Sequence, residues 1–226
     1  MASAADILAR LWDLASPVNV AGMARYGMSV NERLGVPVPE MRRIAKAAGK
    51  DHAAALQLWD TGIAEARIVA SMVAVPAQLT EEQMDAWVKD FDSWDVCDQV
   101  CMNLFEKSPL ARRKIVEWAS REEEFVKRAS FALLACVAWH DRRATDEELI
   151  AFLPLVAQAA SDERNFVKKA VNWALRTIGK RDRALNRAAI QAAREIQRLD
   201  SRAARWIAAD ALRELESAKV QERLPD

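Results

Sequence analysis

A tryptophan and a carboxylate at helical spacing are the side chains in this sequence best placed to do chemistry. Trp94 and Asp98 lie four residues apart, so on a helix they share one face. Ser93 is a typical helix N-cap, and Asp95 in the first turn suits the positive end of the helix dipole. An indole beside a carboxylate can hold a cation or a developing positive charge. The ordinary alternative is that Trp94 packs in the core, Asp95 favours the helix start and Asp98 is solvated.

Helix-forming residues dominate the elements that must position this pair. Ala, Leu, Arg, Glu and Gln fill long stretches, Gly and Pro are sparse, and no alternating Val/Ile/Thr/Tyr pattern of a strand stands out. The sequence therefore predicts an all-α protein. The predicted helices span residues 3–15, 19–26, 39–48, 52–60, 63–74, 80–91, 94–107, 110–119, 123–139, 146–160, 164–178, 183–198 and 201–217.

A short motif repeats along the chain. Phe-Val-Lys-Arg-Ala at 125–129 recurs as Phe-Val-Lys-Lys-Ala at 166–170, an offset of 41 residues, with looser copies at 205–208 and 66–70. A period near 40 residues is typical of HEAT-type helical repeats, which stack into a superhelix with a concave face. We expect one domain over 1–226, a HEAT-like solenoid whose concave groove is basic. The alternative is that the recurrence reflects repeat packing alone.

The charges are balanced overall but unevenly distributed. The chain holds 33 basic and 33 acidic residues, yet residues 164–213 contain 13 Lys/Arg and four Asp/Glu, a net charge of +9 that leaves −9 for the remainder. Such asymmetry points to a polyanion-binding face. Arg-rich solvated helix faces are an equal alternative on charge alone.

Several protein classes are disfavoured by composition. Cys97, Cys101 and Cys136 form no CxxC pair, which indicates a reducing, cytoplasmic compartment, and Cys97 and Cys101 are expected to be buried apolar residues. No secretion signal or membrane-spanning apolar run is expected. His52 and His140 are the two histidines of the sequence, so few ligands are available for a zinc site. No Walker motif and no dinucleotide-binding glycine motif is present.

Four segments together resemble the AlkD-type DNA alkylation-repair proteins, which are HEAT-like-repeat DNA glycosylases. The segments are Gly-Val-Pro-Val-Pro-Glu-Met-Arg-Arg at 35–43, Ser-Trp-Asp-Val-Cys-Asp at 93–98, the motif at 125–129, and Lys-Lys-Ala-Val-Asn-Trp-Ala-Leu-Arg at 168–176. The second resembles the family's Trp-Asp-x-x-Asp motif and the fourth its Lys-Ala-x-x-Trp-x-Leu-Arg helix. The resemblance covers residues 18–215 in order and spacing.

The resemblance implies an enzyme and a site. Asp98 is then the catalytic carboxylate, Trp94 and Trp173 are aromatic walls against the damaged nucleotide, and Arg128 contacts the DNA backbone near the lesion. The family excises N3- and N7-alkylated purines from duplex DNA as free bases and leaves an abasic site. No cofactor or metal is needed, and a monomer is expected. The residues expected to make the groove basic are Lys127, Arg128, Lys168, Lys169, Arg176, Lys180 and Arg205.

The sequence departs from the family in ways that leave two other functions open. Cys97 replaces a more usual aliphatic residue, the chain is neutral where family members tend to be basic, and Tyr26 and Arg42 are weak candidates for DNA contacts. One alternative is a noncatalytic binder of distorted or branched DNA. The other is a protein-interaction solenoid, the commonest use of HEAT repeats.

The remaining tryptophans are expected to serve packing. Trp206, beside Arg205, is open between core and groove wall. The tryptophans expected in the core or in packing between repeats are Trp12, Trp59, Trp87, Trp118 and Trp139.

Overall fold

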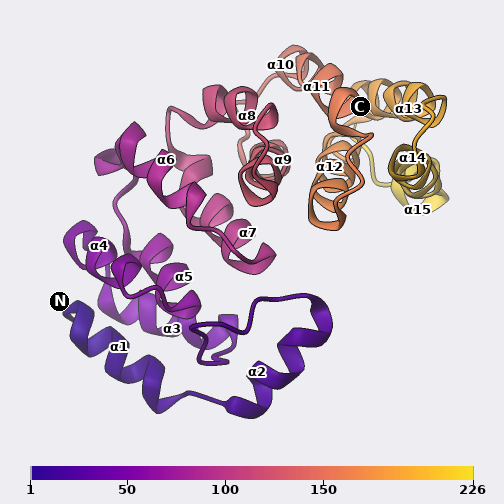
Figure 1. Cartoon of the computed structure of the whole chain (residues 1–226). Helices are drawn as coiled ribbons and strands as arrows, with labels where there is room; N and C mark the ends of the chain where they lie inside the picture. The colour runs from indigo at the N-terminus through magenta and orange to yellow at the C-terminus, as the bar shows by residue number, and fades with distance from the viewer. Residues whose placement is uncertain (1, 226) are drawn as a thin grey trace. The chain divides into compact units, whose positions relative to one another are not determined.

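A computed structural model describes residues 2–225, and every regular element in that range is helical (Figure 1). The predicted all-α class is therefore confirmed. The helices cluster into two compact units, one ending at Leu110 and the other beginning at Ala111. In a repeat array each repeat contacts only its neighbours, so an array can divide at any junction between repeats. The single domain over 1–226 stays a prediction.

The first unit contains seven α-helices and three short 3₁₀ helices among its described residues. Its α-helices are α1 (Ala4–Asp13), α2 (Pro17–Met23), α3 (Val38–Ala48), α4 (His52–Asp60), α5 (Ala64–Val73), α6 (Glu81–Lys89) and α7 (Trp94–Asn103). Its 3₁₀ helices are η1 (Ala24–Tyr26), η2 (Pro76–Gln78) and η3 (Phe105–Lys107).

The second unit continues with eight α-helices in its described part. They are α8 (Ala111–Ala119), α9 (Glu124–His140), α10 (Asp146–Ala151), α11 (Leu153–Ala159), α12 (Asn165–Ile178), α13 (Arg183–Gln197), α14 (Arg202–Leu215) and α15 (Ala218–Gln221).

Helix α5 forms the centre of the first unit. It packs against α3, α4 and α7, and eight of its ten residues are buried. A helix that is buried on nearly all sides belongs to a core rather than to a surface. The indoles of Trp59 on α4 and Trp87 on α6 stack with ring centroids 3.9 Å apart, which joins α6 to the same core. Because α7 packs on α5, the position of its first turn depends on this core.

Helices α9 and α12 hold the same central place in the second unit. Helix α9 packs against α8 and α12, and α12 packs in turn against α14 (Figure 1). Residues 128–138 of α9 are all buried. The repeated motif lies at the start of both helices, where the Phe125 and Phe166 rings stack at 5.5 Å. The 41-residue offset therefore corresponds to one helix-to-helix step.

Most predicted helices are confirmed to within two residues, and the exceptions have local causes. The segment predicted at 146–160 is two helices, because Pro154 has no N–H to donate and fits only in a first turn. The segment predicted at 94–107 leaves α-geometry at Leu104 and continues as a 3₁₀ turn. Helix α15 was not predicted. No helix between residues 2 and 225 is long and apolar enough to cross a membrane.

The predicted core tryptophans divide into two groups. Trp59, Trp87 and Trp118 are buried as expected. The prediction is wrong for Trp12 and Trp139, which are 59% and 58% exposed. Each is the next-to-last residue of its helix, where no further helical turn covers the side chain. Trp206, left open by the sequence, is 41% exposed.

Candidate nucleic-acid site

Ser93 begins α7 as predicted, but its side chain does not cap the helix. Its backbone is extended (φ −147°, ψ 143°), as an N-cap residue requires, and its hydroxyl makes no bond to an N–H of α7. Instead Ser93 Oγ accepts from the Ser29 backbone N–H at 3.2 Å and donates to Asp95 Oδ1 at 2.5 Å. Ser93 therefore ties the loop before α3 to the first turn of α7.

A buried ion pair completes this attachment. Arg33 donates through Nη1 to Asp95 Oδ2 at 2.6 Å and through Nη2 to Asp95 Oδ1 at 3.0 Å, and the two side chains are 1% and 14% exposed. Burial lowers the pKa of Arg33, but the hydrogen bonds and charge of Asp95, with Glu65 and Asp92 nearby, outweigh it and raise the pKa above its usual value. The paired, two-bond geometry fixes both partners.

The loop that carries Arg33 is itself bonded to α5. The fully buried carboxylate of Glu65 accepts from the backbone N–H groups of Leu34 at 2.9 Å and Gly35 at 2.8 Å. Gly35 has a φ of +79°, and a Cβ there would lie 2.4 Å from the carbonyl oxygen of Ser16. Only glycine fits this backbone. The backbone conformation therefore explains why a glycine begins the 35–43 segment.

Trp94 and Asp98 lie on the side of α7 that is not buried. Their neighbours Val96, Cys97 and Val100 face the core, whereas both members of the pair are partly exposed. Trp94 Nε1 donates to the carbonyl oxygen of Tyr26 at 3.1 Å, which holds the indole against η1. Asp98 lies one helical turn later, as the spacing predicts. Cys97 and Cys101 are fully buried, which confirms their predicted apolar role.

Tyr26 and Arg42 both lie on the surface of the first unit. Tyr26 is 73% exposed, and Arg42 is exposed on α3. Their side chains are accessible, and a DNA contact at either position stays a prediction.

The basic residues of the repeated motif are engaged within the second unit. Arg128 is largely buried, and its Nη1 donates to the Phe166 carbonyl oxygen at 2.7 Å, from α9 to α12. Lys127 Nζ lies 3.3 Å from Asp162 Oδ2. Lys168 Nζ lies 5.4 Å from the centroid of the Trp206 ring, a cation–π contact from α12 to α14. These basic side chains therefore join each repeat to the next.

Lys169, Lys180 and Arg205 are the exposed members of the predicted basic set, and Lys180 is paired with Glu214. Lys169 points to solvent from the first turns of α12. Arg205 Nη1 lies 3.3 Å from Asp200 Oδ1, but both side chains are more than half exposed, so this pair is weak and easily exchanged.

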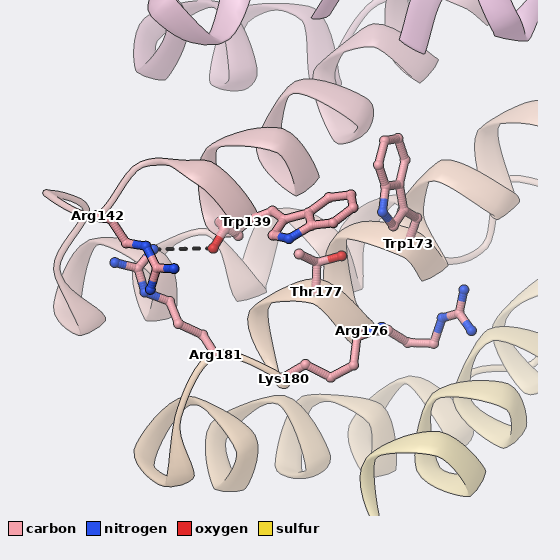
Figure 2. Close-up of a pocket in the computed structure, with 8 residues that line it drawn as sticks. Trp139, Arg142, Trp173, Arg176, Thr177, Lys180 and Arg181 are labelled. Atoms are coloured by element: carbon pink, nitrogen blue, oxygen red, sulfur yellow. Dashed lines mark hydrogen bonds between the residues drawn. The ribbon is translucent and has the colours of Figure 1, made fainter. Parts of the chain in front are cut away.

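Trp173 lines a pocket at the C-terminal ends of α9 and α12 (Figure 2). The cavity measures about 530 Å³, within the range of about 300–1,000 Å³ for small-molecule sites. Figure 2 shows the Trp139 indole above Thr177 with the Trp173 indole next to it, all within the second unit. None of the described residues lining the pocket is acidic. Its basic lining residues are Arg142, Arg176, Lys180 and Arg181.

Acidic residues of α14 balance two of these cations from outside the pocket. Arg176 Nη1 lies 2.7 Å from Glu214 Oε2 and 3.3 Å from Asp210 Oδ2, and Lys180 Nζ lies 2.9 Å from Glu214 Oε1. Burial raises the pKa of Glu214, but the hydrogen bonds and charges of Lys180 and Arg176 outweigh this and lower the pKa below its usual value. Fewer positive charges are therefore available to a ligand than the net charge of +9 for residues 164–213 suggests.

Five residues that line the pocket were not predicted as site residues: Ala138, Trp139, Arg142, Thr177 and Arg181. The sequence predicts Trp139 in the core or in packing between repeats. The available signal was the run Trp-His-Asp-Arg-Arg at 139–143, an aromatic residue followed by basic residues where a helix ends. Arg181 fixes this end of α9 by donating to the carbonyl oxygens of Ala138, Asp141 and Ala144 at 2.7–3.2 Å.

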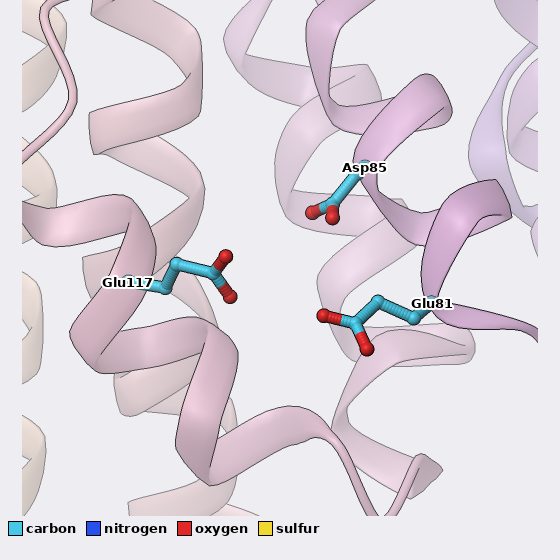
Figure 3. Close-up of side chains that lie close together, drawn as sticks. All are labelled: Glu81, Asp85 and Glu117. Carbon is cyan, nitrogen blue, oxygen red and sulfur yellow. The ribbon is translucent and has the colours of Figure 1, made fainter.

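We do not assign a metal site to the acidic side chains on α6 and α8. Figure 3 shows Glu81 and Asp85 one turn apart on α6, and Glu117 on α8. Glu117 accepts from Lys114 Nζ at 2.8 Å within its own helix. Carboxylates at this spacing are ordinary on helix surfaces.

Comparisons with known proteins agree with the helical architecture. A solved structure from a family related to the HEAT-like repeat DNA glycosylases, with affinity for branched DNA structures, is similar at a TM-score of 0.78 and 19% identity, covering 94% of this chain and 95% of that one. This likeness confirms the HEAT-like repeat fold. A designed armadillo repeat protein in complex with the peptide (KR)4 matches at a TM-score of 0.41 and 14% identity, over 82% of this chain and 79% of its own, too distant to bear on the site.

Sequence comparison gives the family. No curated protein is similar enough in sequence to match. The family model described as DNA alkylation repair enzyme matches residues 7–215, nearly the whole chain. The predicted resemblance over 18–215 is confirmed and extended, and the chain belongs to the DNA alkylation repair enzyme family.

Proposed function

We propose that the protein is a monofunctional DNA glycosylase that hydrolyses the N-glycosidic bond of cationic N3- or N7-alkylated purines in duplex DNA. Asp98 is the catalytic carboxylate, and Trp94 and Trp173 are the aromatic groups that face the damaged nucleotide. One observation supports this most: Trp94 and Asp98 share the partly exposed side of α7, whose first turn is fixed by the Arg33–Asp95 ion pair. A carboxylate on a rigid helix is preorganised for charge stabilisation.

The chemistry requires few groups. The alkylated purine is already cationic, so no general acid has to protonate it, whereas glycosidases that must protonate a leaving group use two carboxylates. Water adds to C1′ of the sugar, and the C1′–N9 bond breaks with its electron pair going to the purine, which becomes neutral. The proton of the water passes to Asp98 and then to solvent. Indoles stabilise cationic base and sugar by about 0.5–2 kcal/mol each.

The basic residues of the second unit supply DNA affinity rather than sequence readout. Phosphate contacts position a duplex but carry no sequence information. Lys169 and Arg205 are exposed and can contact phosphates, and Lys168 and Lys127 are partly exposed. Arg176 and Lys180 bind phosphate only by exchanging Glu214, and Arg128 positions α12 through the Phe166 carbonyl.

A noncatalytic binder of branched DNA is the second candidate. It is favoured by the similarity to a protein related to the glycosylases and having affinity for branched DNA structures. This function needs the basic and aromatic side chains but not the Asp98 carboxylate.

Release of free methylated purines from alkylated duplex DNA separates the two candidates. The wild type is compared with Asp98→Asn, with Asp92→Asn as control, because Asp92 is an exposed carboxylate just before α7 and the substitution changes charge equally. Release by the wild type and the control but not by Asp98→Asn supports the glycosylase. Absence of release by the wild type, with tighter binding of a four-way junction than of a linear duplex, supports the second candidate.

A further inference from the structure

The pocket between the ends of α9 and α12 contains side chains that the proposed hydrolysis does not use. Only Trp173 belongs to the proposed catalytic site; Trp139 and Arg142 do not. We propose that this pocket binds an unpaired nucleotide of the DNA, with the base against Trp139 and its phosphate at Arg142. The inference rests on the proposed function only in taking DNA as the ligand, and it does not require base release.

The indole of Trp139 is available for stacking. It is 58% exposed, although residues 128–138 that precede it on the helix are all buried, so packing does not account for it. The His140 ring stacks on it at 4.8 Å with an interplanar angle of 20°, which leaves the indole fixed in orientation. Figure 2 shows Trp139 extending into the pocket above Thr177, toward Trp173. Aromatic side chains placed in this way stack unpaired bases without regard to sequence.

Arg142 is the pocket cation best able to take a phosphate. Arg181 donates to three backbone carbonyl oxygens, and Arg176 and Lys180 share Glu214. Arg142 is exposed, and no ion pair or hydrogen bond of its side chain occurs among the described residues. Arg176 and Lys180 are balanced by Glu214 and Arg181 lies near the charge of Asp146, so Arg142 is the cation left for a singly charged phosphodiester.

The size and lining disfavour other ligands. About 530 Å³ accommodates one nucleotide but not a base pair with its backbone. The cations disfavour an apolar peptide. An acidic peptide would use the cations but leave two indoles without a stacking partner. A free nucleotide has the same chemistry as a nucleotide in a strand, so the test must distinguish these sources.

The experiment measures dissociation constants of the full chain for two labelled duplexes by fluorescence anisotropy at one salt concentration. One duplex carries a single unpaired adenosine, and the other is the same duplex fully paired. The variants are Trp139→Ala, Trp139→Phe and Arg142→Gln. Trp12→Ala is the matched control for the indole, since Trp12 is 59% exposed outside the pocket, and Arg198→Gln is the control for the charge.

We expect Trp139→Ala to weaken binding of the bulged duplex by about 5- to 150-fold, the range given by base–aromatic stacking. Trp139→Phe retains a ring and should lose less than half of that effect on a logarithmic scale. Arg142→Gln should weaken it about threefold to tenfold. Both controls should change binding less than twofold, and the paired duplex should be affected less than threefold by every variant.

Three results would overturn the inference. Equal losses for bulged and paired duplexes would make Trp139 and Arg142 general backbone contacts. Displacement of the bulged duplex by free dAMP, at concentrations similar to those of the bulged duplex itself, would assign the pocket to a free nucleotide. Displacement by polyglutamate but not by unlabelled bulged DNA would assign it to an acidic peptide. Asp98→Asn should bind the bulged duplex as the wild type does. A protein that releases no base can therefore still show the expected binding, which separates failure of this inference from failure of the proposed function.

Discussion

The start of α7 and the pocket at the ends of α9 and α12 use arginine in opposite ways. Arg33 is 1% exposed and its guanidinium is held by both oxygens of Asp95. Arg142 is exposed and makes no ion pair in the part of the chain that the structure describes. Breaking a buried pair leaves an uncompensated charge, whereas an exposed cation is solvated either way. The first region therefore depends on its arginine for stability, whereas the second does not.

Removal of the buried partner should produce the largest effect on stability. Arg33→Ala leaves the Asp95 and Glu65 carboxylates without their cation and should lower the free energy of unfolding by about 3–5 kcal/mol. Arg142→Ala should change it by less than about 0.5 kcal/mol. Urea unfolding followed by circular dichroism measures both. Similar losses in the two variants would contradict the contrast between the regions.

Asp141 fixes the loop that carries Arg142, and through Asp141 the stability of the protein should depend on pH. Asp141 accepts from the Arg143 backbone N–H, which lowers its pKa; burial opposes this, and bonds from the Arg112 and Arg143 side chains lower it further, to about 2. A depressed pKa adds stability that is complete above the unfolded value near 4 and is lost as the pH falls through 2. Asp141→Asn should lower the free energy of unfolding by about 2 kcal/mol at pH 7.

The measurement is urea unfolding of wild type and Asp141→Asn at pH 7 and pH 2.5. The difference between them should shrink at the lower pH, because the stability that the ionised carboxylate adds is by then largely lost from the wild type. Asp60→Asn removes an exposed carboxylate at the end of α4 and serves as the control. A difference that stays constant with pH would show that Asp141 acts through packing and not through its charge.

The Trp94 indole should contribute less, because only one hydrogen bond is involved. Trp94→Phe keeps an aromatic ring but removes the Nε1–H that donates to the Tyr26 carbonyl oxygen. We expect a loss of about 1 kcal/mol, confined to the attachment of η1. Hydrogen exchange of the backbone amides in residues 24–28 should become about fivefold faster, whereas amides of α5 should be unaffected. Uniform acceleration in both segments would contradict a local role.

The sequence predicted the fold better than the site. Helical periodicity and the recurring Phe-Val-Lys motif predict the stacked helices, because the apolar positions that repeat are those that pack, as Phe125 and Phe166 do. Exposure at a helix end depends on which segments pack against that end in space, so the open position of Trp139 was missed. Pairing between residues far apart in the sequence leaves no local pattern, as between Arg33 and Asp95, which are 62 residues apart. Counts of basic residues likewise did not reveal that Glu214 balances Arg176.

Two adjacent lysines of α12 give the smallest and most selective test. Lys168 contacts the Trp206 ring, so Lys168→Gln should lower the free energy of unfolding by about 0.5 kcal/mol, whereas Lys169→Gln should leave it unchanged because Lys169 is exposed. If both lysines contact phosphates, each substitution should lower the slope of log K against log salt for duplex DNA by about 0.9. A lower slope for Lys169→Gln alone would mean that Lys168 serves packing between α12 and α14, and the number of phosphate contacts would then be one fewer than the sequence suggests.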